Sequence, residues 1–99
     1  MHTVVYRWKI KSGSEEKFKE HWAEATRFFV TEQKSLGSRL HLANDGTHYA
    51  YAQWPSEEMF NYERKLSTAQ AESLRLMIEC IETTLPASQG HMICDLLVK

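Results

Sequence analysis

The chain has 99 residues, of which 42% are hydrophobic and 25% charged, and this length and composition predict one soluble domain, residues 1–99, around a single core. Twelve Lys and Arg against thirteen Asp and Glu leave a net charge of −1 with no run of like charges, so nucleic acid is not an expected partner. Arg7 and Lys9 interrupt the N-terminal apolar run, so neither a signal peptide nor a membrane span is expected, and the predicted location is cytoplasmic.

Residues 3–10 alternate in the manner of a half-buried strand, with Tyr6 and Trp8 on the apolar side. A helix is expected to follow, with either a capping box from Ser12 to Glu15 or a simple cap at Ser14. Its apolar stripe recurs at helical spacing and extends the predicted helix to about residue 33; the stripe consists of Phe18, Trp22, Ala25 and Phe29.

A hairpin is predicted from residues 39–43, the turn signal Asn44-Asp45-Gly46 and a strand over 47–54. A loop of two or four residues would pair Ala43 with His48. The helix-covered face would then hold Arg39, His41, His48, Ala50, Ala52 and Trp54, and the opposite, apolar face Leu40, Leu42, Tyr49 and Tyr51. A loop of three residues would shift the register by one and undo this sorting.

After Pro55, Ser56 can cap a short helix over residues 57–66, and residues 67–70 form a second capping box. The spacing of Leu74, Met77, Ile78, Ile81 and Leu85 predicts a longer helix that ends before Pro86. Residues 91–98 alternate and are expected to form the last strand. Cys80 and Cys94 lack metal-site spacing and are expected to be two buried, reduced thiols.

The predicted order βαββαβ is the ferredoxin-like α+β plan, a four-stranded antiparallel sheet with helices on one face. Three segments, WKIKSGSEEKFKEHW, the hairpin with a charged tip and YAQWPSEEMF, together resemble the antibiotic biosynthesis monooxygenase (ABM) domain over nearly the whole chain. The resemblance implies a homodimeric α/β barrel, formed sheet against sheet, with a pocket between the sheet and the helices of each subunit. Leu40, Leu42, Tyr49, Tyr51 and Val5 are the residues expected at the dimer interface.

Two branches of this superfamily differ in chemistry. The haem-degrading branch has a first-strand asparagine, a tryptophan at the end of the third strand and a helical histidine; only Trp54 matches, because Tyr6 occupies the asparagine position and residues 57–85 contain no histidine. The other branch oxygenates polycyclic phenols without metal or flavin. Trp54 fits its pocket tryptophan, although the asparagine that precedes that tryptophan is absent.

The resemblance therefore implies a cofactor-independent monooxygenase for a small, electron-rich aromatic substrate of phenol or quinol type, with no metal, haem or flavin. His48 is the candidate catalytic base, because an imidazole can accept a phenolic proton near neutral pH. The candidate substrate-binding residues are Trp54, Tyr6, Trp8 and His41. Each also has an ordinary structural reading, as a hydrogen-bonded histidine or a core aromatic. The alternative function is a dimeric barrel that binds a small ligand without catalysis.

Overall fold

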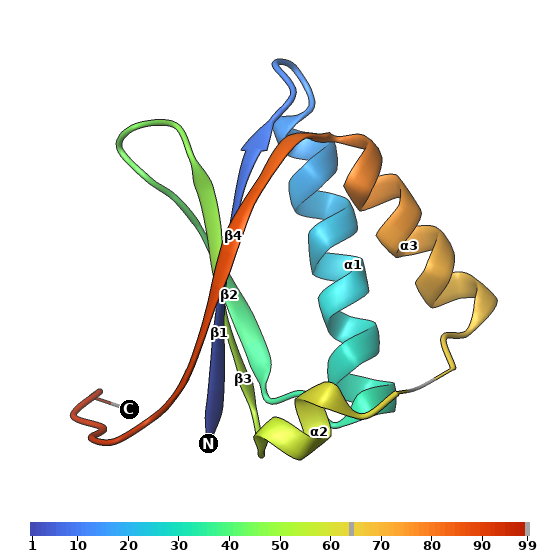
Figure 1. The fold of residues 1–99 in the computed structure, drawn as a ribbon. Helices are drawn as coiled ribbons and strands as arrows, with labels where there is room; N and C mark the ends of the chain where they lie inside the picture. The colour runs from blue at the N-terminus through green and yellow to red at the C-terminus, as the bar shows by residue number, and fades with distance from the viewer. Residues whose placement is uncertain (64, 99) are drawn as a thin grey trace.

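The computed structural model describes residues 1–63 and 65–98. Its elements are β1 (His2–Ile10), α1 (Glu15–Gln33), β2 (Gly37–Leu42), β3 (His48–Trp54), α2 (Glu57–Asn61), α3 (Thr68–Glu79) and β4 (Ile81–His91). The strands form one antiparallel sheet in the order β2-β3-β1-β4. Both long helices pack on the same face of the sheet, and the described chain places no helix on the other face (Figure 1). The predicted ferredoxin-like fold is confirmed.

The β2–β3 hairpin has the three-residue loop, so the register predicted from loops of two or four residues is wrong. Ala43 donates its N–H to the carbonyl oxygen of Thr47 at 2.8 Å, which leaves Asn44, Asp45 and Gly46 as the loop. Gly46 has a φ of 89°, a left-handed conformation that glycine adopts without a Cβ penalty. The Asp45 carboxylate accepts the Thr47 N–H at 2.9 Å, and this hydrogen bond lowers the pKa of Asp45.

In the observed register, every residue of β2 lies on the opposite face of the sheet from the face predicted for it. Leu40 pairs with Ala50 and Leu42 with His48, so both leucines lie on the helix-covered side, and Leu40 packs against the core. His41 pairs instead with Tyr49 on the open side, and their rings stack at 4.7 Å. The predictions that Leu40 and Leu42 form the open face, and that His41 shares a face with Trp54, are therefore wrong.

The second half of the chain departs from its predicted boundaries. Ser56 and Ser67 cap α2 and α3 as expected, each accepting the N–H of the third residue beyond it at 3.1 Å. However, α2 ends at Asn61, within the range predicted to reach Leu66; Arg64 lies outside the described residues. The predicted helix through Ile81 and Leu85 is also wrong, because α3 ends at Glu79 and both residues belong to β4.

The last strand is β4, not residues 91–98. Pro86 can lie inside it because β4 is an edge strand, where one side of the backbone needs no partner. The pairing with β1 also shifts between Val5 and Arg7, which leaves Pro86 in a bulge. Residues 92–98 follow as a tail without regular structure, in which Cys94 is exposed. The prediction of two buried thiols holds for Cys80 alone.

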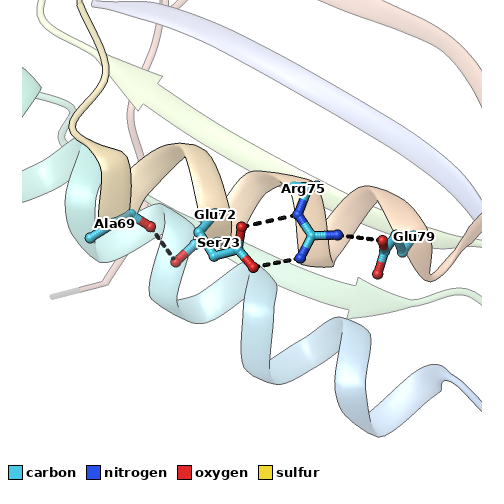
Figure 2. A network of polar contacts seen from close by, with 5 residues as sticks. All are labelled: Ala69, Glu72, Ser73, Arg75 and Glu79. Atoms are coloured by element: carbon cyan, nitrogen blue, oxygen red, sulfur yellow. Dashed lines mark hydrogen bonds and ion pairs between the residues drawn. The ribbon is translucent and has the colours of Figure 1, made fainter.

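The core lies between the sheet and the helices in two clusters. The first contains Trp8, Phe18, Ala50 and Cys80, and the second contains Val4, Ala52 and Trp54. On the buried side of α3, Ser73 donates to the Ala69 carbonyl at 3.2 Å (Figure 2). The outer surface of α3 is polar, and Arg75 lies there between Glu72 and Glu79, one helical turn to either side (Figure 2). These ion pairs are more than half exposed, so solvent screens them and the buried face supplies most of the stability of α3.

Candidate functional site: an aromatic cavity between sheet and helices

A cavity of about 360 Å³ lies between the sheet and the helices, between the two core clusters. We call it the aromatic cavity, because six of its lining side chains are aromatic. The lining consists of Tyr6, Trp8, Trp22, Ala25, Thr26, Phe29, Ser35, Ser38, Ala52, Trp54, Phe60, Leu74 and Met77. The small side chain of Ala52, on β3, leaves space beside the larger rings. A cavity of this size is typical of small-molecule sites.

Trp54 ends β3 and forms one wall of the aromatic cavity. It is 5% exposed, and its indole meets Phe29 of α1 at 6.0 Å and Phe60 of α2 at 5.6 Å, both in edge-to-face geometry. Pro55 and the Ser56 cap turn the chain into α2 immediately after this residue. The strand end and the short helix together therefore fix the indole, at a strand-to-helix junction that the sequence predicted.

Tyr6 and Trp8 lie on the same face of β1 as predicted, and both line the aromatic cavity. Their rings are nearly parallel, 9° apart, with centroids at 5.7 Å. Burial raises the pKa of the Tyr6 hydroxyl, because the phenolate would lose its hydration. At neutral pH this hydroxyl is therefore protonated and can donate a hydrogen bond to a ligand oxygen.

Apart from the indole N–H groups of its tryptophans, the other polar side-chain groups of the lining are hydroxyl groups. Ser38 Oγ donates to the Tyr51 carbonyl at 2.9 Å, and Ser35 Oγ accepts the Gly37 N–H at 3.1 Å. No carboxylate, imidazole or amine belongs to the described lining. Among the described residues, no group of three or more His, Cys, Asp or Glu could hold a metal ion. The aromatic cavity is therefore suited to binding a largely apolar ring with one or two oxygen atoms.

Neither candidate histidine lines the aromatic cavity. His48 is on the predicted face, but it packs edge-on against Phe18 at 5.7 Å, six residues along β3 from Trp54. At about 3.3 Å per residue, their Cα atoms are roughly 20 Å apart. The Nδ1 atom of His48 is buried with no hydrogen-bond partner among the described residues. His41 is exposed on the opposite face of the sheet, so the structure does not bring it to Trp54.

The sequence reasoning missed several lining residues. Trp22 and Phe29 were predicted on the apolar stripe of α1, and the structure shows that they wall the cavity without filling it. Ser38 was missed because only the correct hairpin register places it inward, opposite Ala52. Phe60 was expected within a short helix without an assigned partner, and no periodic pattern in so short a helix could indicate which way its ring points.

Two buried glutamines, Gln33 at the end of α1 and Gln70 in the first turn of α3, meet just outside the aromatic cavity. Gln33 Nε2 donates to Gln70 Oε1 at 2.8 Å, and Gln70 has no exposed surface. Their remaining groups, Gln33 Oε1 and Gln70 Nε2, have no hydrogen-bond partner among the described residues. Gln33 is one turn beyond Phe29 on α1, and Gln70 one turn before Leu74 on α3. The pair therefore closes this end of the helix interface with polar groups.

Comparison with known proteins gives a consistent picture of the fold. No protein-family model and no curated protein sequence matches the chain. Among solved structures, a proposed antibiotic biosynthesis monooxygenase of Bordetella bronchiseptica is similar over 94% of this chain and 97% of its own, with a TM-score of 0.77 and 16% identity. The chain has the ABM fold.

Other ABM-fold structures agree. SnoaB from Streptomyces nogalater, a cofactor-independent oxygenase, is similar over 96% of this chain and 95% of its own, with a TM-score of 0.75 and 15% identity. A proposed ABM protein of Caulobacter crescentus covers 93% of this chain and 89% of its own, with a TM-score of 0.75 and 9% identity. The ABM resemblance noted in the sequence is thus confirmed for the fold. No described helix is long and apolar enough to cross a membrane.

Proposed function

We propose that the protein is a cofactor-independent monooxygenase that acts on a small, electron-rich aromatic compound of phenol or quinol type. The observation that carries this proposal is the aromatic cavity of about 360 Å³, with Trp54 and Tyr6 in its walls. The similarity in fold to SnoaB, a cofactor-independent oxygenase, supports the same reading. The oxidoreductase class thus rests on the fold and the substrate class on the lining of the cavity.

The chemistry takes its electrons from the substrate. An anthrone, for example, loses a proton to give its enolate, which passes one electron to dioxygen; the two radicals then combine into a peroxide. Loss of water from the peroxide leaves a new ring carbonyl, so one oxygen atom enters the product and the other leaves as water. This reaction requires from the protein a flat apolar site, a donor for the anionic oxygen and protection of the radical pair from water.

Trp54 and Trp8 are proposed to contact the faces of the substrate ring, and Tyr6 to donate a hydrogen bond to the enolate oxygen. The raised pKa of Tyr6 suits this role, since the hydroxyl keeps its proton where an anion forms beside it. The substrate proton passes to solvent or to a base outside the lining. His48, the base predicted from the sequence, would have to act from its position beside Phe18.

One observation favours the alternative, a dimeric barrel that binds a small aromatic ligand without catalysis. The described lining contains hydroxyl groups but no strong base. Such a cavity binds a ring equally well whether or not oxygen reacts with it. Turnover, rather than binding, therefore separates the two functions.

The test is oxygen consumption with anthrone, with the quinone product followed by absorbance. We expect turnover by the native protein, and a fall in kcat of about 10²-fold in Tyr6→Phe, because that variant keeps the ring and loses the donor to the anionic oxygen. His48→Ala is expected to change kcat by less than about threefold, since His48 does not line the cavity. Binding of anthrone without oxygen consumption would favour the non-catalytic alternative; a full loss of activity in His48→Ala would restore the base predicted from the sequence.

We infer that the functional unit is a homodimer formed by the open face of the sheet. The outward positions of β1, β2 and β3 carry Tyr49, Tyr51 and Val5 together with the cations Arg7, Lys9 and Arg39, and no carboxylate; Arg7 lies 5.8 Å from the Tyr49 ring. The hairpin tip and the C-terminal tail both bend toward this open side (Figure 1).

The hairpin tip and the C-terminal tail carry the carboxylates that the open face lacks. The hairpin tip has Asp45, and the tail has Asp95 among apolar side chains that are largely exposed: Ile93 and Leu96 at 87% and Val98 at 98%. A second copy, placed face to face, would cover the tyrosines, bury the apolar side chains of the tail and bring carboxylates to the cations. The open face is thus complementary to another copy of this chain.

Sedimentation at micromolar concentration is expected to show a dimer. Tyr51→Glu should give monomer or aggregate, because the new carboxylate would be desolvated at the centre of the interface. Lys17→Glu, a charge change on the exposed side of α1, serves as the control and should remain dimeric. A stable monomer of the native chain at this concentration would contradict the homodimer.

A further inference from the structure

A second cavity, of about 410 Å³ and lined mostly by exposed residues, lies where the start of β1, the junction of β3 with α2 and the end of β4 meet. We call it the polar cavity. Its side-chain groups come from the start of β1, the residues after β3 and the end of β4, and include His2, Ser56, Glu57, Gln89 and His91. These residues share one end of the helix-covered face, because His2 pairs with Trp54 on one side and with His91 on the other.

His2 is held in a fixed position at the boundary of the two cavities. It is 6% exposed, its Nε2 atom is 3.0 Å from Gln89 Oε1, and its ring packs on Phe60 at 5.3 Å. Gln89 comes from β4 and Phe60 from α2, so three elements determine the orientation of this imidazole. A buried histidine with a side-chain partner can present its ring to a ligand at little entropic cost.

Phe60 separates the two cavities. The centroid of its ring lies 5.6 Å from that of Trp54, which lines the aromatic cavity. It lies 5.3 Å from that of His2, which lines the polar cavity. Since Trp54 and His2 are directly paired on neighbouring strands, their Cα atoms are only about 5 Å apart. The two cavities are therefore neighbours, and a short substituent on a ring beside Trp54 would have to pass the edge of Phe60 to reach His2.

The lining of the polar cavity indicates the kind of group it would accept. The Gln89 amide nitrogen and the Ser56 hydroxyl can donate, the Glu57 carboxylate accepts, and the His91 imidazole can do either. A mixture of donors and acceptors suits hydroxyl or amide groups, which need both. The negative charge of Glu57 disfavours a carboxylate or a phosphate in the same cavity.

We propose that the polar cavity is a second subsite, which binds a neutral hydroxyl- or amide-bearing arm of the aromatic substrate, with His2 and Gln89 as its recognition residues. This inference rests on the proposed function, since it places the ring in the aromatic cavity. It defines the substrate class further: an aromatic ring system with a short, neutral, hydrogen-bonding arm, rather than a bare ring.

Calorimetric titration with three probes tests this assignment: 2-naphthol, its 2,3-dihydroxypropyl ether and its 2-methylbutyl ether. The two ethers have arms of the same shape, one with two hydroxyl groups and the other with none. The native protein is expected to bind the diol ether at least about tenfold more tightly than the alkyl ether, which corresponds to the net contribution of one or two hydrogen bonds.

Two variants test which residues cause the preference for the diol ether over the alkyl ether. His2→Phe keeps the ring that packs on Phe60 and removes its nitrogens, and Gln89→Leu removes the amide; each should reduce the preference for the diol to less than about threefold and leave 2-naphthol affinity within about twofold. His21→Phe, on α1 and outside both linings, is the control and should keep the full preference. Circular dichroism and thermal unfolding establish that each variant is folded.

The outcomes separate the two proposals. Binding of 2-naphthol with no preference for the diol, or a preference that survives in both His2→Phe and Gln89→Leu, would overturn the subsite and leave the aromatic cavity as the ligand site. Failure of the native protein to bind 2-naphthol or either ether would overturn the aromatic-ligand proposal, and the subsite with it.

Discussion

Trp54→Ala is expected to lower kcat/KM for anthrone by about 10²-fold, an effect on activity as large as the one expected from Tyr6→Phe. The indole forms a wall of the aromatic cavity and is fixed by Phe29 and Phe60, so its removal enlarges the cavity and lets the ring move. A displacement of about 1 Å of the reacting group costs that much in rate. Steady-state oxygen consumption measures the effect.

Stability must be separated from activity in this variant, because removing a buried tryptophan also costs about 3–5 kcal/mol of unfolding free energy. Trp54→Phe keeps an aromatic wall and should lose no more than about tenfold in kcat/KM. Tyr62→Phe, at an exposed position outside both cavity linings, is the control for a conservative aromatic change and should be unaffected. Native-like kcat/KM in a folded Trp54→Ala would remove Trp54 from the site.

Phe18→Ala is expected to lower the free energy of unfolding by about 3–5 kcal/mol, the largest effect on stability from a residue outside the cavity. The Phe18 side chain has no exposed surface and meets Trp8 at 5.3 Å and His48 at 5.7 Å. Alanine would leave a hole between α1 and the sheet that these rings cannot fill. Urea unfolding, at a fixed protein concentration because a dimer makes stability concentration-dependent, measures the loss.

Val30→Ala provides the matched control on the same helix. Val30 is 44% exposed, so its truncation should cost less than about 1 kcal/mol. In folded Phe18→Ala, the affinity for 2-naphthol should remain within a few-fold of native, since Phe18 does not line the aromatic cavity. A change in unfolding free energy below about 1 kcal/mol would show that Phe18 is not a principal core residue.

The first strand and helix, β1 and α1, could be predicted because their local signals agree with one another. The alternation in β1 and the 3.6-residue period in α1 both match the buried positions, and the Phe18 stripe faces the sheet. The Ser56 and Ser67 caps were also readable, because a side-chain hydroxyl that accepts a hydrogen bond from an N–H of the first turn is a local interaction. Such signals do not depend on distant parts of the chain.

The end of the fold could not be predicted in the same way. Ile81 continues the helical spacing of Leu74 and Met77, so periodicity alone extends α3 through it. Its pairing with Ile10 on β1 decides otherwise, and that contact joins residues 71 positions apart. Pro86 argued against a strand, yet the edge position and the bulge admit it. Tertiary pairing therefore overrides local spacing here.

The candidate site was predictable in its aromatic half only. Tyr6, Trp8 and Trp54 follow from strand alternation and hold whatever the hairpin register. The prediction for His41 depended on that register and was wrong. His48 lies on the predicted face, but a shared face does not bring it to Trp54, which is six residues away along β3. His2 received no role because its neighbour Gln89 belongs to a strand that the sequence did not place.

The three-residue loop after β2 has a consequence for how such chains diverge. Deletion of one residue among Asn44, Asp45 and Gly46 would leave a two-residue turn between Ala43 and Thr47, so the pairing of β2 with β3, and the inward and outward sets of β2, would stay the same. Deletion of Leu42, inside the strand, would instead pair His41 with His48 and Leu40 with Tyr49, so that Leu40 would leave the core and His41 would enter it. A single codon lost inside β2, rather than at the hairpin tip, would thus convert a pocket wall into a contact surface, so equivalent positions in distant relatives should be matched by strand pairing rather than by distance from the turn.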